Sequence, residues 1–499
     1  MLSYIRTAMQ DYEWSVVMDI AHQDYLLAAL YRTLSVVTLL ICLLTEVSIL
    51  VSQRHAALHL VPLSAILLLH SFCRRDATTD IYLVDFSCLK PPRQQRAPIP
   101  AFLEHLKLMT GLFKDDGIEF MATAMAASGM GDETHLPPSL FYIPPDATHG
   151  NAVREARASL LPALDELFAK TGVPPSAVGA VVACCSGFCP APSLAAIVAG
   201  HYRMRSDVRT FNISGMGCSA GVIGVDVARS LLTAAAVSYA VVVSTEVLTV
   251  GWYSGRDHSK LLLNCFFRTG CSAALVTNKR GGAHRTPAKY RLVRLVRTNK
   301  IADDGSYYSG YREEDDEGIT GFNVGRGVGR AFEAALRAHL ATLGVSVLPW
   351  RERLRYATAV LRRSLLRDHS PAAAPSFRTA AEHFCLPTTW GPMIRRLGRG
   401  LGLGETEMEA ALMAFHRFGN QSAATLWYQL AYLEAKGMVR KGDRVWQLGV
   451  GTGMKVNSAL WERVTADEDD DDGRTGAVGP RRRLGPWIDC IHRYPVSSG

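Results

Sequence analysis

The stretch "NISGMGCSAG", residues 212–221, places Cys218 among three glycines. The segment 179–188 has the apolar composition of a buried strand, and residues 219–236 carry apolar side chains at helical spacing. Cys218 is therefore predicted to lie at a turn that leads into the N-terminus of a helix. Glycines at such a turn permit backbone conformations that other residues avoid, and they leave room for a substrate.

This position supports two interpretations of the thiol. The helix dipole and the free backbone N–H groups of a helix N-terminus lower the pKa of a cysteine and so favour a nucleophilic thiolate. Alternatively, Cys218 packs in the core as a small apolar residue, which is the usual place of a free cysteine. The stretch alone leaves both interpretations open.

The composition limits the class of protein. The chain has 499 residues, 48% of them hydrophobic, enough for two or three ordinary domains or one large duplicated domain. The net charge of +8 suits anionic small molecules or an anionic membrane surface and argues against a dedicated nucleic-acid binder. Eleven cysteines without regular spacing predict free thiols in a reducing compartment. The cysteine cluster at 184–189 has no nearby histidine, so no metal or cofactor site is predicted.

Two apolar segments near the start of the chain, residues 34–52 and 56–72, predict membrane spans. Together they form a transmembrane hairpin over residues 33–75, preceded by a cytosolic segment, residues 1–32. The arginine pair at the end of the hairpin places both of its ends in the cytosol. One span followed by a buried helix is the alternative.

The rest of the chain alternates helical patterns with apolar runs of strand length. Residues 76–101 are predicted to be a strand followed by a proline-rich linker. Unbroken apolar runs such as residues 236–250 are typical of sheet strands covered on both faces. The alternation occurs twice, over residues 102–290 and 291–499, which predicts a layered α/β fold of two related halves.

Two segments of the second half have the character of insertions. Residues 350–375 are basic, and their apolar residues recur at helical spacing. This pattern is typical of a helix on a membrane surface, with a solvated helix packed on the core as the alternative. Residues 466–483, an acidic run followed by a basic one, are predicted to be a flexible surface loop.

A second polar constellation lies in "HRFGNQSAATLWYQLAYLEAKG", residues 416–437. Asn420 precedes a helical pattern, where asparagine most often caps the helix. His416, taken alone, is more often a structural histidine. These residues suggest a functional site only in combination with other motifs.

Five segments of this chain resemble, in order, signature motifs of the plant-type 3-ketoacyl-CoA synthases, the condensing enzymes of very-long-chain fatty acid elongation. They are "YLVDFSCLKPP", "GDETHLPPSLFYIPP", "NISGMGCSAGVIGVD", the 416–437 stretch and "GPWIDCIHRYPV". The resemblance implies a duplicated thiolase-like fold of five αβαβα layers. It also implies that the hairpin anchors the protein in the endoplasmic reticulum membrane, with the catalytic region in the cytosol.

The resemblance further implies the chemistry. Cys218 matches the nucleophile that accepts an acyl group from acyl-CoA, after which malonyl-CoA loses CO₂ and extends the chain to a 3-ketoacyl-CoA. Asn420 matches the donor that holds the malonyl thioester oxygen, and His416 and His383 match further histidines of the site. Other elongase subunits and a second copy of the chain are the implied protein partners.

One position departs from the family pattern. In "FCLPTTWGPMI", residues 384–394, Pro387 stands where the family has a catalytic histidine. We predict an active acyltransferase. The alternatives are an impaired family member that acts as a regulatory or scaffolding subunit, and a cysteine hydrolase, which is disfavoured because no general-base histidine accompanies Cys218.

Overall fold

The computed structural model describes residues 80–496, except residues 110 and 235 and the segments 282–285, 367–374 and 466–484. The predicted N-terminal segment, transmembrane hairpin and acidic-basic loop therefore lie outside the described residues. Among the helices of the described part, none is long and apolar enough to cross a bilayer.

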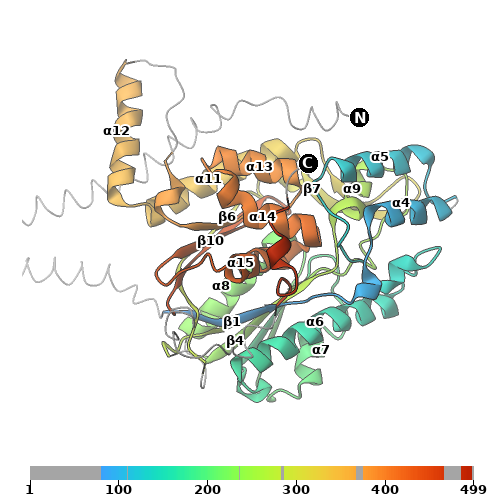
Figure 1. Cartoon of the computed structure of the whole chain (residues 1–499), viewed down its shortest axis with the longest axis horizontal. Coiled ribbons are helices and arrows are strands. Elements are labelled where there is room, and N and C mark those ends of the chain that lie inside the picture. Colours follow the sequence, from blue (N-terminus) through green and yellow to red (C-terminus); the bar gives the residue numbers. More distant parts are fainter. Residues whose placement is uncertain are drawn as a thin grey trace, which may run out of the picture.

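Strands and helices alternate along the described chain (Figure 1). The strands are β1 (Tyr82–Cys88), β2 (Ala180–Cys184), β3 (Arg209–Ile213), β4 (Tyr239–Thr245), β5 (Cys271–Thr277), β6 (Tyr290–Asn299), β7 (Gly310–Glu314), β8 (Thr320–Val324), β9 (His383–Cys385), β10 (Arg444–Gly451) and β11 (Lys455–Arg463). The α-helices are α4 (Ile99–Leu108), α5 (Asp115–Ala126), α6 (His149–Thr171), α7 (Leu194–His201), α8 (Ala220–Thr233), α9 (His258–Phe266), α10 (Asp304–Tyr307), α11 (Val328–Val347), α12 (Trp350–Leu366), α13 (Gly391–Gly400), α14 (Glu405–Phe418) and α15 (Thr425–Ala435).

The main sheet has the strand order β3-β2-β4-β5-β1-β6-β11-β10-β9. β1 and β6 pair only at Tyr82–Arg291 and Leu83–Tyr290, so the sheet divides there into two halves. In the first half β2 and β4 are parallel, and β5 and β1 follow antiparallel. In the second half β9 and β10 are parallel, and β11 and β6 follow antiparallel. This is the duplicated α/β arrangement that the sequence pattern predicts.

Five layers follow from the helix contacts. α6 and α7 cover the outer face of the first half-sheet, and α11 and α14 contact the second. Between the half-sheets lie α8 and α15, which each contact strands of both. Strand β4 contributes side chains to the apolar cores on both faces of the first half-sheet. Val241 and Val243 belong to the core on the α6 side and Val242 to the core on the α8 side, because successive side chains alternate across a strand.

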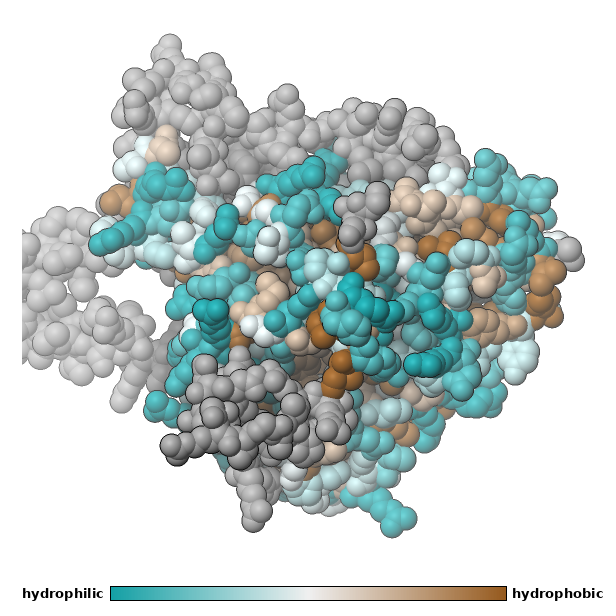
Figure 2. Space-filling view, in the orientation of Figure 1, coloured by the Kyte–Doolittle hydropathy of each residue, from teal (hydrophilic) through white to brown (hydrophobic). Residues whose placement is uncertain are grey.

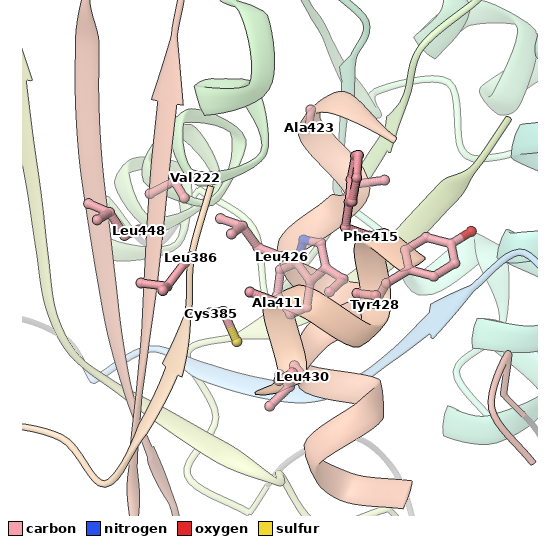
Figure 3. Close-up of a cluster of buried hydrophobic side chains, with 14 of the residues drawn as sticks. Val222, Cys385, Leu386, Ala411, Phe415, Ala423, Leu426, Tyr428, Leu430 and Leu448 are labelled. Carbon is pink, nitrogen blue, oxygen red and sulfur yellow. The ribbon is translucent and has the colours of Figure 1, made fainter. Parts of the chain in front are cut away.

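The central layer is held by apolar packing (Figure 3). Leu426 and Leu430 on α15 lie in one buried cluster with Leu386, which follows β9, and with Leu448 on β10. Val222 of α8 belongs to the same cluster, so both central helices share one core. β1 lies within the segment predicted to be a strand and linker, and all seven of its residues are buried.

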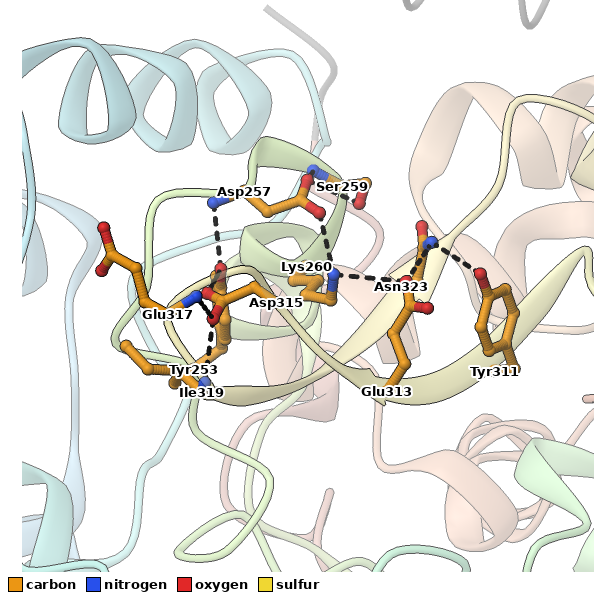
Figure 4. A network of polar contacts seen from close by, with 10 residues as sticks. All are labelled: Tyr253, Asp257, Ser259, Lys260, Tyr311, Glu313, Asp315, Glu317, Ile319 and Asn323. Carbon is orange, nitrogen blue, oxygen red and sulfur yellow. Dashed lines mark hydrogen bonds and ion pairs between the residues drawn. The ribbon is translucent and has the colours of Figure 1, made fainter.

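The β7–β8 hairpin lies outside the main sheet and is fixed by a polar network (Figure 4). The buried Lys260 ammonium on α9 contacts Asp257 Oδ2 at 2.9 Å and Glu313 Oε1 at 3.3 Å. From the same hairpin, Arg312 donates a 3.1 Å hydrogen bond to the Gly187 carbonyl. The network thus braces the loop after β2. The described residues on the face drawn in Figure 2 are mostly hydrophilic, with apolar residues gathered at the edge over α4.

Candidate active site

Cys218 lies in a single 3₁₀ turn, Gly217–Ser219, that runs directly into α8. The predicted position at a helix N-terminus is confirmed. Gly215 and Gly217 have φ angles of +68° and +57°, in the left-handed region that glycine adopts without strain. The thiol is half-buried, so it is neither a fully packed core cysteine nor freely exposed.

Gly221 serves a different purpose from the other two glycines. A Cβ at this position would collide with the carbonyl oxygen of Ala423, in the 3₁₀ turn Ser422–Ala424 that precedes α15. The beginnings of the two central helices therefore touch, and only a residue without a side chain permits this approach.

Gly221→Ala is expected to destabilise the protein by about 1–3 kcal/mol, because the added methyl group must push the two helix starts apart. Product formation should fall together with stability, since the separation moves the 420–424 segment away from Cys218. Thermal unfolding and activity would be measured side by side. Gly200→Ala in α7 is the control, because a Cβ there meets no atom within 4 Å. Equal effects of the two changes would contradict the contact argument.

Asn420 faces the cysteine from the second half of the fold. The Cys218 Sγ atom lies 4.0 Å from Asn420 Oδ1. The Asn420 backbone is fixed because its N–H donates to the Phe266 carbonyl and its carbonyl accepts from Arg268, both at 2.9 Å. Asn420 does not cap α15, since that helix begins at Thr425 and its N-cap residue is Ala424. The structure thus brings Cys218 and Asn420 together.

Glu246, which the sequence analysis did not single out, connects the two sides of this site. Its Oε1 atom accepts a 2.7 Å hydrogen bond from the Gly187 N–H, and its Oε2 atom accepts one of 2.9 Å from the Ser422 hydroxyl. Ser422 has a φ of +54°, unusual for a residue with a side chain, and such a conformation persists only where neighbours hold it. The available signal was a lone carboxylate directly after a buried strand, β4, where sheet proteins commonly place functional groups.

The acid-base state of the cysteine differs from the sequence prediction. Burial raises the pKa of Cys218 to about 11, and the Glu246 carboxylate raises it further, while hydrogen bonding with Ser422 and Asn420 acts in the opposite direction. Burial also raises the pKa of Glu246. The lowered pKa that the first interpretation of the stretch expects is therefore wrong for the free protein, because desolvation and a nearby carboxylate outweigh the helix N-terminus.

Glu246→Gln is expected to lower the pKa of Cys218, because it removes the neighbouring negative charge. Ser422→Ala should raise that pKa, because it removes a hydroxyl whose proton can turn from Glu246 to the thiolate. Below its pKa the thiolate fraction grows about tenfold per pH unit, so alkylation of Cys218 by iodoacetamide should accelerate from pH 8 to pH 10 in all three proteins. Mass spectrometry of the Cys218 peptide gives the rates. A wild-type rate that levels off near pH 7, or two variants that shift in the same direction, would contradict the assignment.

The two predicted histidines are not at the thiol. His416 packs against the 129–131 loop, with its Nδ1 atom 3.1 Å from the Gly129 carbonyl and its ring where a Cβ on Gly131 would lie. This contact gives it a structural place beside the site.

His383 forms an ion pair with Asp443, with 3.1 Å between His383 Nε2 and Asp443 Oδ2. It pairs with Val445 at the start of β10, whereas Gly451 at the other end of that strand abuts the Cys218 turn. At about 3.3 Å per residue this separation is about 20 Å. The position of His383 does not support its predicted place among the histidines of the site.

Pro387 lies buried in a loop that adjoins the asparagine side of the site. The Gln429 side-chain amide holds this loop with two hydrogen bonds. Its oxygen accepts from the Leu386 N–H at 2.7 Å, and its nitrogen donates to the Leu386 carbonyl at 2.7 Å. Trp390, at the end of the loop, contacts the ring of Phe266, whose carbonyl holds Asn420. Proline offers no N–H and no polar side-chain atom, so position 387 supplies no donor.

Comparison with known proteins places this site in a family. A family model described as FAE1/Type III polyketide synthase-like protein matches residues 72–365, and one described as 3-oxoacyl-[acyl-carrier-protein (ACP)] synthase III C terminal matches residues 381–463. The chain is 43% identical over 416 residues to 3-ketoacyl-CoA synthase 6 of Arabidopsis thaliana, covering 83% of this chain and 81% of that protein. With 3-ketoacyl-CoA synthase 4 of the same plant it shares 42% identity over 417 residues, covering 84% and 78%.

Solved structures of lower identity share the fold. A fungal type III polyketide synthase, ORAS, superimposes with a TM-score of 0.59 at 17% identity, covering 77% of this chain and 99% of that one. CsyB, solved as a complex with CoA-SH, gives a TM-score of 0.59 at 15% identity, covering 77% and 100%. The predicted thiolase-like α/β class is thereby confirmed. The matches over most of the chain, together with the paired cysteine and asparagine, show that it belongs to the 3-ketoacyl-CoA synthase family.

Proposed function

We propose that the protein catalyses the decarboxylative condensation of a fatty acyl-CoA with malonyl-CoA, the chain-extending step of very-long-chain fatty acid elongation. The observation that carries this proposal is the Cys218 thiol at the start of α8, facing the Asn420 amide across the two halves of the fold. The names of the relatives support a condensing enzyme over a regulatory subunit.

The reaction has two stages at one sulfur atom. The Cys218 sulfur attacks the thioester carbonyl of acyl-CoA, the bond to CoA breaks, and CoA leaves as the thiol with the proton of Cys218. Malonyl-CoA then releases CO₂, and the resulting carbanion attacks the carbonyl of the acyl-cysteine. The carbon–sulfur bond to Cys218 breaks, which frees the enzyme and a 3-ketoacyl-CoA two carbons longer.

Asn420 is suited to the second stage. The Ser422 backbone N–H donates to Asn420 Oδ1 at 2.8 Å, and since a backbone amide can only donate, it fixes the oxygen on that side. The Nδ2 group is then left to donate to the malonyl thioester oxygen as it becomes enolate-like. Loss of one such donor typically costs about 100- to 1000-fold in rate. Glu246 is a positioning residue, because it orients Ser422 and through it Asn420.

Membrane anchorage belongs to the same proposal. The apolar segments within residues 33–75 support an endoplasmic reticulum hairpin, with the α/β region in the cytosol.

Deleting residues 1–75 is expected to release the protein from integral membrane association, since these are the only long apolar segments of the sequence. Extraction of microsomes with alkaline carbonate is the measurement. Carbonate-resistant retention of the shortened protein would refute the hairpin.

The proposal also includes protein partners, and one surface of the structure supports one of them. β3 is an edge strand, and its residues Arg209, Thr210 and Phe211 are exposed. An open sheet edge favours pairing with another strand, which supports a homodimer. We also propose other subunits of the elongase as partners, and this proposal is supported only by membership of the family.

The test of function is an assay of microsomes that contain the protein, supplied with a long acyl-CoA and labelled malonyl-CoA. Labelled 3-ketoacyl-CoA supports the proposal. Acylation of Cys218 without chain extension would favour the regulatory subunit instead, and release of free fatty acid would favour a cysteine hydrolase.

A further inference from the structure

Helix α12, Trp350–Leu366, projects from the body of the molecule beside α11 (Figure 1). Its base is anchored: Tyr356 is buried, and Glu352 Oε1 accepts a 2.8 Å hydrogen bond from the Ser376 N–H. On another side of the same turns, Trp350 and Leu354 are 62% and 54% exposed. A tryptophan and a leucine four positions apart lie on one helix face, so their exposure creates an apolar stripe open to the surroundings.

The charged residues beside this stripe are mostly positive. Arg351 and Arg355 are exposed and, at one and five positions from Trp350, they flank the stripe. The guanidinium of Arg351 lies 5.5 Å from the ring centroid of Trp350. Glu352 is the only acidic residue of the helix, and it is already paired with Arg355 at 2.5 Å. By sequence, the helix continues with two more arginines, at 362 and 363.

We propose that α12 lies on an anionic bilayer surface, with the Trp350–Leu354 stripe entering the lipid headgroup boundary and the flanking arginines contacting lipid phosphates. Three observations favour a bilayer over a protein partner. The helix is arginine-rich where an anionic surface requires positive charge, tryptophan is typical of the membrane interface, and α12 is too short and too charged to span. This contact is separate from the hairpin and from the chemistry at Cys218.

The consequence for the proposed reaction is geometric. A hairpin alone leaves the α/β region free to rotate about its linker, whereas a second contact through α12 fixes which face of the enzyme meets the bilayer. A membrane-dissolved acyl chain would then reach the enzyme from a fixed direction.

Site-specific photo-crosslinking of the full-length protein tests the proposal. Leu354 is replaced by p-benzoylphenylalanine, and the protein is reconstituted in phosphatidylcholine vesicles with or without phosphatidylserine. The control carries the same group at His201, exposed at the end of α7, which lies at the opposite end of the molecule in Figure 1. We expect lipid adducts at position 354 to exceed those at 201 at least fivefold and to increase with phosphatidylserine.

A second variant separates charge from contact. The double change Arg351→Gln with Arg355→Gln should remove the dependence on phosphatidylserine and leave the hairpin insertion and Cys218 alkylation unchanged. Equal lipid adducts at 354 and 201 would overturn the proposal. Adducts at 354 that join two copies of the chain, or that join Leu354 to the first 79 residues, would also overturn it and would identify the other occupant of the stripe.

Discussion

Cys218→Ala is expected to abolish 3-ketoacyl-CoA formation, with a loss of about 10⁴-fold or more. Removal of a covalent nucleophile eliminates the acyl-enzyme, and the remaining groups of such a site catalyse little by themselves. The half-buried sulfur at the start of α8 is the thiol that faces Asn420, and Cys184 and Cys265 are fully enclosed, with burial raising the pKa of each to about 12. Chain extension and covalent acyl transfer would be measured separately, the latter by mass spectrometry.

Cys189→Ala is the matched control, because this thiol is exposed and lies on the neighbouring loop after β2. It should retain wild-type product formation and leave acylation of Cys218 intact. Acyl adducts on Cys189, or product formation by the Cys218→Ala protein, would show that the nucleophile has been misassigned.

Pro387→His is expected to raise the rate of condensation by about 10- to 100-fold without changing acylation of Cys218. The reason is that a missing donor to the enolate oxygen costs about 100- to 1000-fold, and a new imidazole restores only part of it. The loop can accept the change, since Gln429 holds it through Leu386 and Thr388 and makes no bond to residue 387 itself. Single-turnover assays with preformed acyl-enzyme isolate the condensation step.

Pro387→Ala separates the new donor from the loss of the proline ring, and it should give no gain. Exchange of "LPTTW", residues 386–390, for "IHAGG" should give a larger gain than the single change, because it also removes the Trp390 ring that packs against Phe266. Gly391 is kept, since a Cβ there would lie 2.7 Å from the Ser128 carbonyl oxygen. A wild-type protein that already condenses as fast as its relatives, and loses that activity on Asn420→Ala, would show that the histidine is dispensable.

Local chemistry made much of the fold predictable. Strands such as β2 and β4 are fully buried, so their sequences are unbroken apolar runs. The turn at Cys218 could be located because its glycines must adopt left-handed conformations, and the helix after it has a clear apolar period. The duplication followed from the order of these patterns.

The remaining features depend on contacts between distant segments. Gly221 meets Ala423 from the other half of the chain, and Glu246 meets Ser422 across 176 residues of sequence, and no local pattern encodes such pairs. The raised pKa of Cys218 also depends on tertiary contacts, because the burial of the thiol and the approach of the Glu246 carboxylate arise only in the folded protein. His383 is matched to a site histidine by resemblance alone, and the register of β9 on β10 carries it to the far end of the strand.

The meeting of α8 with α15 has a consequence for whether the two halves can act apart. The two helices occupy equivalent places in the two repeats, yet one start supplies the sulfur and the other the amide. The two halves therefore divide the reacting groups between them, so neither half alone holds a complete site. A chain cut between β5 and β6 should therefore be inactive as separate pieces and regain activity only when both pieces are produced together.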